Sequence, residues 1–534
     1  MTPARYPRRA VLRMGASGAA AAAFLAACGL GNGGMLASAP SVPSAKRSGD
    51  LRIGYAAPTG DRVGLADAVY SRLVAFDPRS GRAYGDLAER FEVTPDGMTV
   101  MAKLREGMHF HPNAKNLADS LSADNVRRDF ADRRAAGDYL FSTAVDRIEA
   151  PDTRTVVLRM RAPFSLLIDY LADTTTGGIR AATRYSVVDA AMGSGPFVPV
   201  AREDAGTTLV ANPVYYRANL PLLDRIHVLD SAAPRDLAAS VASGELDIAF
   251  HPADATAEQV RTPKGASTAT LLRRTSRRMR ALGFSLAPEK AAGLTTRAVA
   301  AFKDARVRKA ASLALDRAAI LQVDDSTLAG PVGPAHVNDA LSRDELAKHP
   351  LYKHDPQQAK QLLAAAGVPD LSFALEGANR MQTRAVITLV EKQLREVGFQ
   401  PRTRLLPNAD WERLFLAGDF EAGVAEFDDM RTPDVGLRLA MSGGLTGTFS
   451  LWGFSSPAFD AAARKVFAEV DPRRRGERSR AAQRVLLDEV PPLLPLGSPP
   501  DQATIGNSFQ GFEFDAFEFN STWNAAAWRL GTAK

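Results

Sequence analysis

Cysteine is nearly absent from this chain of 534 residues, which contains Cys28 and no other. A single cysteine excludes intramolecular disulfides and zinc sites built from several thiolates. The motifs G-x-S-x-G, H-E-x-x-H and G-x-x-x-x-G-K, which mark serine hydrolases, zinc proteases and nucleotide-binding loops, are missing as well. We therefore expect a protein that is not an enzyme and that needs no cofactor or metal.

A strong surplus of one charge is lacking too. Four arginines among the first 27 residues account for most of the formal net charge of +6, and the rest of the chain carries 62 basic and 60 acidic side chains. A protein that neutralises nucleic-acid phosphates needs a larger basic surplus, so we expect no nucleic-acid partner. The hydrophobic share of 46% and the charged share of 24% are typical of a folded soluble protein.

Long apolar runs are confined to the N-terminal leader. Its run from Met14 to Ala27 is too short to cross a hydrocarbon core of roughly 30 Å, and no later stretch is long and apolar enough to span one. The pair Arg8-Arg9 resembles a twin-arginine export signal, and Leu25-Ala26-Ala27-Cys28 resembles a lipobox, whose cysteine is acylated. We predict a signal peptide at 1–27, a lipid on Cys28, a flexible tether at 28–49 and anchoring to the outer face of the cell membrane. A generic secretion signal with an incidental cysteine is the alternative.

The folded part of the chain has the patterns of a mixed α and β protein. Leu51–Tyr55 alternates apolar and polar residues as a strand does, and Phe91–Val93 and Thr99–Leu104 flank a turn and indicate a hairpin. Asp304 and Asp355 are expected to cap two helices that each have one apolar face. Further strands are expected at 155–160, 207–211, 225–229 and 399–406, and a further helix at 385–397.

Several short stretches stand in a particular order along the chain. They are Asp86–Val93 with Asp96-Gly97, Leu104–His111, Gly193–Phe197, Asn212–Arg217, Pro221–Ile226, Ser243–Ala249, Arg306–Arg317, Asp355–Gly367 and Ser456–Asp460. Their order resembles that of the family 5 extracytoplasmic solute-binding proteins of ABC transporters, which handle peptides, dipeptides and nickel. The resemblance covers roughly residues 51–512. It implies an α/β fold with two lobes around a cleft, periplasmic-binding-protein-like (class II, cluster C), with an extra domain in the first lobe.

The resemblance also implies a division of the chain. It places the first lobe at 50–75, 190–283 and 497–534, the accessory domain at 76–189 and the second lobe at 284–496. We expect the chain to cross between lobes through the strand Met279–Leu286 and again around Pro491–Pro500. Such crossings act as hinges, and a ligand that contacts both lobes favours their closed arrangement.

A ligand site follows from the resemblance. In peptide-binding relatives an aspartate on a loop of the second lobe holds the α-ammonium of the ligand, and Asp429 stands at the matching place. Glu426 departs from the family pattern, which has a tryptophan there. An exposed acidic loop with Arg431 as a local partner is the alternative for Asp429, and core packing is the alternative for the aromatic residues. The expected ligand-binding residues are Asp429, Asp428, Phe427, Trp452, Phe454 and Arg380.

These features together predict a function. We expect a monomeric substrate-binding lipoprotein that captures a peptide or similar amine-bearing small solute and delivers it to an ABC permease and its ATPase. The departures at Glu426 and Ser285 leave room for an alternative, a surface lipoprotein on the same scaffold used for sensing or adhesion without transport. An exported enzyme is the third hypothesis.

Two other groups of polar residues could carry chemistry. His109 and His111 place two imidazoles near one another, but packing at a strand end is favoured over a metal site. Five arginines lie between Arg273 and Arg280, and such a charge run predicts a solvated basic face.

Overall fold

The computed structural model describes most of the chain beyond the leader. The described residues are 36, 39, 42, 46–56, 65–77, 82–94, 96–113, 117–138, 140–162, 164, 166–173, 177–184, 190–203, 206–231, 234–251, 268–286, 296–429, 431, 433, 435–442, 453–467, 469, 471–514 and 522–531. The predicted signal peptide, Cys28 and most of the predicted tether lie outside these residues. Among the helices of the described part, none combines the length and the apolar character that a membrane crossing requires.

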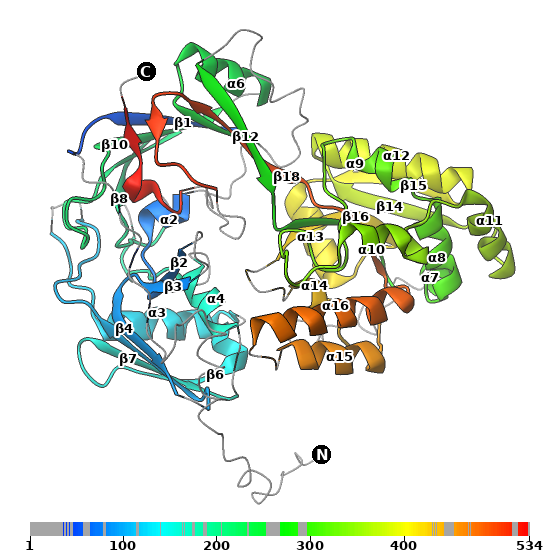
Figure 1. Ribbon diagram of the computed structural model, residues 1–534, viewed down its shortest axis with the longest axis horizontal. Coiled ribbons are helices and arrows are strands. Elements are labelled where there is room, and N and C mark those ends of the chain that lie inside the picture. The colour runs from blue at the N-terminus through cyan, green and yellow to red at the C-terminus, as the bar shows by residue number, and fades with distance from the viewer. Residues whose placement is uncertain are drawn as a thin grey trace, which may run out of the picture.

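The first body of the molecule is built on a seven-stranded sheet (Figure 1). Its central strand β1 runs parallel to β10 and to β11, and the outer strands pair antiparallel. The strand order is β12 (Ala269–Thr275), β18 (Pro500–Gly506), β11 (Ile248–His251), β1 (Asp50–Ala56), β10 (Arg225–Ser231), β9 (Gly206–Ala211) and β8 (Phe197–Glu203). Also in this body are α2 (Ala66–Val69), α6 (Pro234–Ser243), β19 (Phe509–Gln510), β20 (Arg529–Leu530) and a 3₁₀ turn at Ala525–Ala527.

A four-stranded antiparallel sheet lies beside it, at the lower left of Figure 1. The predicted hairpin is confirmed, because β4 (Ala88–Val93) pairs antiparallel with β5 (Thr99–Leu104). The sheet continues with β7 (Thr155–Met160) and β6 (Val145–Glu149). The same part of the chain contains the hairpin β2 (Val74–Asp77) and β3 (Arg82–Gly85), α3 (Ala123–Ala135), a π-helical turn at Leu140–Ala144, and α4 (Leu167–Ala172).

The second body is a five-stranded sheet with helices around it, at the right of Figure 1. The strand order is β15 (Gln400–Leu406), β14 (Ser372–Ala378), β16 (Ala422–Asp428), β13 (Arg278–Phe284) and β17 (Leu493–Gly497). The helices are α7 (Arg297–Phe302), α8 (Ala305–Ala314), α9 (Arg317–Leu321), α10 (Arg343–Lys348), α11 (Pro356–Ala365), α12 (Met381–Glu396), α13 (Asn408–Ala417), α14 (Val435–Arg438), α15 (Pro457–Phe467) and α16 (Pro472–Asp488), with a 3₁₀ turn at Pro350–Tyr352.

The helix boundaries of the second body follow from local hydrogen bonds. The Asp304 carboxylate accepts a bond from the Arg306 amide at 2.8 Å, and the Asp355 carboxylate accepts one from the Gln358 amide at 2.9 Å. Both predicted caps are thus confirmed. Gly367, which follows α11, has a φ of 73°, a conformation that glycine adopts without strain.

Three large hydrophobic cores underlie these bodies. One joins buried side chains from Leu282 to Leu496, a second those from Leu73 to Ile179, and a third those from Leu51 to Trp528 around the seven-stranded sheet. The predicted α/β fold with two lobes is confirmed by these sheets, which form two separate bodies. The division of the chain stays our proposal: the three separate cores support three parts, but β13 places residues 278–283 in the second body rather than in the first lobe.

Candidate functional site

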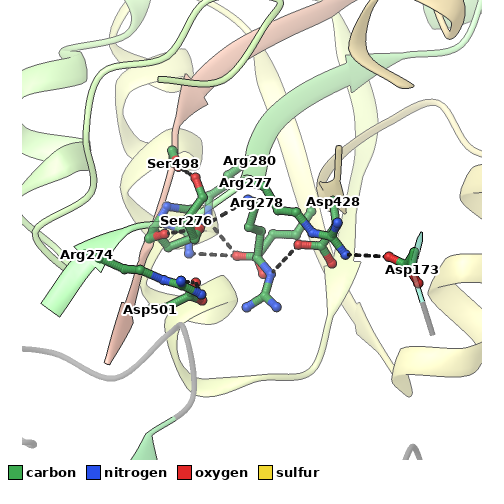
Figure 2. Close-up of polar contacts among 11 residues, drawn as sticks. Asp173, Arg274, Ser276, Arg277, Arg278, Arg280, Asp428, Ser498 and Asp501 are labelled. Carbon is green, nitrogen blue, oxygen red and sulfur yellow. Dashed lines mark hydrogen bonds and ion pairs between the residues drawn. The ribbon is translucent and has the colours of Figure 1, made fainter. Parts of the chain in front are cut away.

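The chain crosses between the two sheets twice, and the two crossings lie side by side. It leaves β12 at Thr275 and enters β13 at Arg278, earlier in the sequence than the boundary at 283 that we expected. The return crossing runs from Gly497 to Pro500. The Ser276 hydroxyl donates to the Pro499 carbonyl at 2.5 Å, and the Ser498 hydroxyl donates to the Ser276 carbonyl at 3.0 Å (Figure 2). These bonds tie the two crossings together.

Three neighbouring strands of the second body end at this boundary. β14 is parallel to β15 and to β16, so the carboxyl ends of all three strands meet at one edge of the sheet. In open α/β sheets this edge is where ligands bind. Arg380 follows β14, and Asp428 and Asp429 stand at and just after the end of β16. The fold therefore brings three of the predicted ligand-binding residues to the edge that a ligand would use.

Asp429 is fully buried at this edge, with 0% of its surface exposed. Its amide donates to the Arg277 carbonyl at 3.3 Å, so the first crossing and the end of β16 are joined there. Gly436 lies against it, since a Cβ added to this glycine would be 3.4 Å from Asp429 Oδ2. The alternative of an exposed acidic loop is wrong for this residue.

The two residues before Asp429 are more accessible. Asp428 is half-buried, and its Oδ1 lies 3.4 Å from Arg278 Nε in an ion pair that stays within the second body. Phe427 is also half-buried and pairs with Met279 across β13 and β16.

Glu426 holds the place that a tryptophan occupies in the family pattern, and it belongs to a buried ionic group. Arg280 Nη2 lies 2.7 Å from Glu426 Oε1, and Arg280 Nη1 lies 2.8 Å from Asp324 Oδ2. Burial opposes ionisation of Glu426, but the positive charges of Arg280 and Arg278 outweigh it and hold the pKa of Glu426 below its usual range. Glu426 thus forms an ion pair with Arg280 of the neighbouring strand β13, and it offers no aromatic ring on which a ligand could stack.

The remaining predicted site residues fall in different places. Arg380 is half-buried directly before α12, and its amide donates to the Ala378 carbonyl at 2.8 Å. Phe454 is 6% exposed and packs in the core of the second body. Core packing was the alternative to ligand contact for the aromatic residues. Trp452 and Cys28 lie outside the described residues. Ligand contact by these residues stays a prediction.

The interpretation of residues 273–280 as a solvated basic face is wrong. Arg277 is 4% exposed and Arg280 is 1% exposed. Arg274 lies 2.9 Å from Asp501, and Arg277 lies 3.8 Å from Asp173 (Figure 2). The acidic partners lie far away in the sequence, so no local pattern marked these arginines as buried.

A cavity of about 490 Å³ lies elsewhere, within the first body. It lies between α2, β3, the segment around Tyr215 and the C-terminal segment, and none of the predicted site residues lines it. Its acidic groups already have partners, since Asp67 lies 3.0 Å from Arg72, and Asp86 accepts hydrogen bonds from the Tyr216 hydroxyl and the Arg72 amide. We therefore place the candidate ligand site at the carboxyl edge of the five-stranded sheet.

His109 and His111 contact different parts of the backbone. His109 Nδ1 donates to the Gly107 carbonyl at 2.9 Å, and His111 Nε2 donates to the Gly195 carbonyl at 2.9 Å. Within the described residues no group of His, Cys, Asp and Glu has an arrangement that could hold a metal ion.

The buried imidazole of His111 should make the stability of the protein depend on pH. Burial lowers its pKa to about 4, whereas the unfolded value is 6.5. The unfolded chain therefore binds the proton more tightly, so stability falls as the pH drops from about 6.5 toward 4, by up to about 3 kcal/mol. We expect His111→Gln to lose this part of the slope in urea denaturation at pH 7 and pH 5. His354→Gln, at an exposed position, should keep the wild-type slope; an unchanged slope in His111→Gln would contradict the assignment.

Comparison with known proteins identifies the family. The family described as bacterial extracellular solute-binding proteins, family 5 Middle, matches residues 82–445. The chain belongs to this family. Its members are binding proteins rather than enzymes, which confirms the expectation drawn from the missing catalytic motifs.

Relatives and solved structures agree with this membership. This family 5 protein is 25% identical over 498 residues to a probable di/tripeptide-binding protein of Pseudomonas aeruginosa, with 85% of this chain and 88% of the relative covered. It matches AgaA of A. tumefaciens R10 in complex with agropinic acid, with a TM-score of 0.73, 22% identity and 91% and 99% of the two chains covered. It also matches DppA of Helicobacter pylori in complex with the peptide STSA, with a TM-score of 0.74, 18% identity and the same coverage. These structures support the fold.

Proposed function

We propose that this protein is the substrate-binding component of an ABC importer, and that it captures a peptide or similar amine-bearing small solute by closure of its two lobes. The observation that carries the proposal is the family match over residues 82–445. The two bodies, joined by two short adjacent crossings, support a hinged closure because such crossings absorb dihedral changes while each lobe moves as a rigid unit.

The preference for an amine-bearing ligand rests on the acidic edge of the second body. Asp429 is buried and Asp428 is half-buried at the end of β16. Two neighbouring carboxylates at the carboxyl edge of the sheet favour a positively charged ligand group, so an ammonium group is a fitting ligand for this edge. Two relatives bear the names probable di/tripeptide-binding protein and glutathione-binding protein, and both kinds of ligand carry an amino group.

The cellular setting completes the proposal. We propose that residues 1–27 export the protein, with the twin-arginine route indicated by Arg8-Arg9, and that a lipid on Cys28 anchors it to the outer face of the cell membrane. There it would act as a monomer and deliver its ligand to a permease and its ATPase.

A second candidate function is favoured by one observation. Glu426 replaces the family's tryptophan and is held by Arg280, so the edge differs from that of peptide-binding relatives. A lipoprotein that uses the same scaffold for sensing or adhesion, without transport, fits such a change.

Calorimetry tests the leading proposal. Titration with a panel of dipeptides and tripeptides should give reversible binding with Kd values near or below about 1 µM, which corresponds to about 8 kcal/mol. The peptides should be recovered intact, and their N-acetylated forms should bind far more weakly. Hydrolysis of the peptides would contradict a binding role, and absence of binding by the whole panel would favour the sensing or adhesion alternative.

A further inference from the structure

Two contacts join the two bodies of the molecule on either side of Asp429. Arg277 Nη2 lies 3.8 Å from Asp173 Oδ2, and the two side chains are 4% and 7% exposed (Figure 2). The guanidinium carbon of Arg431 lies 4.4 Å from the centre of the Phe76 ring, as in a cation–π contact.

The partners of these arginines belong to the first lobe in our division of the chain. Phe76 is on β2 and Asp173 follows α4, and these two elements pack against one another beside the core that runs from Leu73 to Ile179. Arg277 lies in the first crossing, and Arg431 follows the end of β16 in the second lobe. The contact of Arg431 with Phe76 therefore spans the boundary between the lobes, and the contact of Arg277 with Asp173 ties the crossing, directly before β13, to the first lobe.

Arg277 is joined to Asp429 as well. Its carbonyl accepts the Asp429 amide at 3.3 Å, while its side chain reaches Asp173. Arg431 stands two residues after Asp429 on the same loop. The position of the Asp429 backbone is thus fixed between two residues whose side chains hold the opposite lobe.

We propose that Arg277 and Arg431 are positioning residues, which couple closure of the lobes to the placement of Asp429. This inference rests on the proposed function, because it gives Asp429 its role toward a ligand. Arg277 and Asp173 are both buried in this arrangement of the lobes. Removal of one member leaves the other without its ion-pair partner at 3.8 Å, so the closed arrangement becomes less favourable and the lobes open.

The distance between the lobes can be measured without any ligand. The full chain with Cys28→Ser has no other cysteine, so Asp132→Cys on α3 and Glu477→Cys on α16, both at exposed positions, can be spin-labelled selectively. Pulsed electron resonance then gives the distance distribution between the labels. The variants are Arg277→Met, Asp173→Asn and the double variant, with Arg431→Met as a separate test of the second contact.

A matched control is provided by Arg274, three residues before Arg277. It pairs with Asp501 at 2.9 Å, but β12 and β18 belong to the same sheet, so this pair does not span the lobes. Arg274→Met should leave the distance distribution unchanged.

The expected pattern is specific to a coupling role. Each single variant of the Arg277–Asp173 pair should shift the distribution to longer distances, and the double variant should return it toward that of the parent, because neither charge of the pair is left to hydrate. Arg277→Lys should restore closure in part. Arg431→Met should also lengthen the distance. Hydrogen exchange at the Asp429 amide should speed up in the variants that open and in no others.

The fraction of molecules with closed lobes also sets the apparent affinity for a peptide. If that population falls from about one half to about one tenth, apparent binding of any peptide found by calorimetry weakens about fivefold. Unchanged distances in both single variants would overturn the inference, and so would equal opening in Arg274→Met or in the double variant. A peptide panel that fails to bind would contradict the proposed function but would leave the measured coupling between the lobes standing.

Discussion

Replacement of Arg280 with methionine is expected to lower the free energy of unfolding of the second lobe by about 3–5 kcal/mol. Arg280 is 1% exposed and lies between two acidic side chains, Glu426 at 2.7 Å and Asp324 at 2.8 Å. Without the guanidinium, the buried Asp324 and the largely buried Glu426 lose the positive charge that lies between them, and this cost exceeds that of losing a surface pair. Urea denaturation followed by tryptophan fluorescence measures the effect.

Controls separate the buried charge from simple loss of packing. Arg280→Met combined with Glu426→Gln and Asp324→Asn removes all three charges and should recover most of the lost stability. Arg473→Ala, whose side chain is 76% exposed beside Glu477, should leave the midpoint almost unchanged. A triple variant no more stable than Arg280→Met would show that packing, not charge, sets the loss.

The ionic group of Arg280, Glu426 and Asp324 should also make stability depend on pH. The cause is attraction between charges, whereas for His111 it is burial. Because the pKa of Glu426 is lowered by Arg280 and Arg278, its contribution to stability is complete above the unfolded value of 4.5. It is lost as the pH falls through the lower value of the folded state. The Arg280→Met variant should therefore lose less stability than the wild type on acidification below about pH 4.5.

Features that depend on neighbours in sequence were predicted well. Asp304 and Asp355 cap their helices through bonds to amides two and three residues away, and the hairpin of β4 and β5 closes over a short turn. Such interactions form wherever the local sequence allows them, so the residue types alone predict them. The resemblance to the family supplied the order of the elements and the place of Asp429.

The ionic groups of the site could not be predicted in this way. Arg280 and Glu426 are separated by 146 positions, and the contact between them exists because β13 and β16 pair in one sheet. The pairing of Arg277 with Asp173 depends on how the two lobes meet. A run of arginines looks the same in sequence whether its partners are water or distant carboxylates, and only the tertiary fold decides between them.

Replacement of Asp429 with asparagine is expected to weaken binding of an amine-bearing peptide by about 2–5 kcal/mol, or about 30-fold to a few thousand-fold in Kd. Asp429 is fully buried at the carboxyl edge of the five-stranded sheet, where the low dielectric strengthens an interaction between a carboxylate and an ammonium group. The amide of asparagine keeps the shape but not the charge. Calorimetry with the tightest-binding peptide of the panel measures the loss.

The decisive comparison varies the ligand as well as the protein. If Asp429 pairs with the ammonium group, the N-acetylated peptide should bind the wild type and Asp429→Asn almost equally weakly. The acetylated peptide has no positive charge at its N-terminus for residue 429 to bind. Asp428→Asn should cost less, since Asp428 is half-buried and already pairs with Arg278 at 3.4 Å. An equal loss of affinity for the free and the acetylated peptide would contradict this role. It would show that Asp429 only maintains the structure of this edge and that another residue binds the ammonium group.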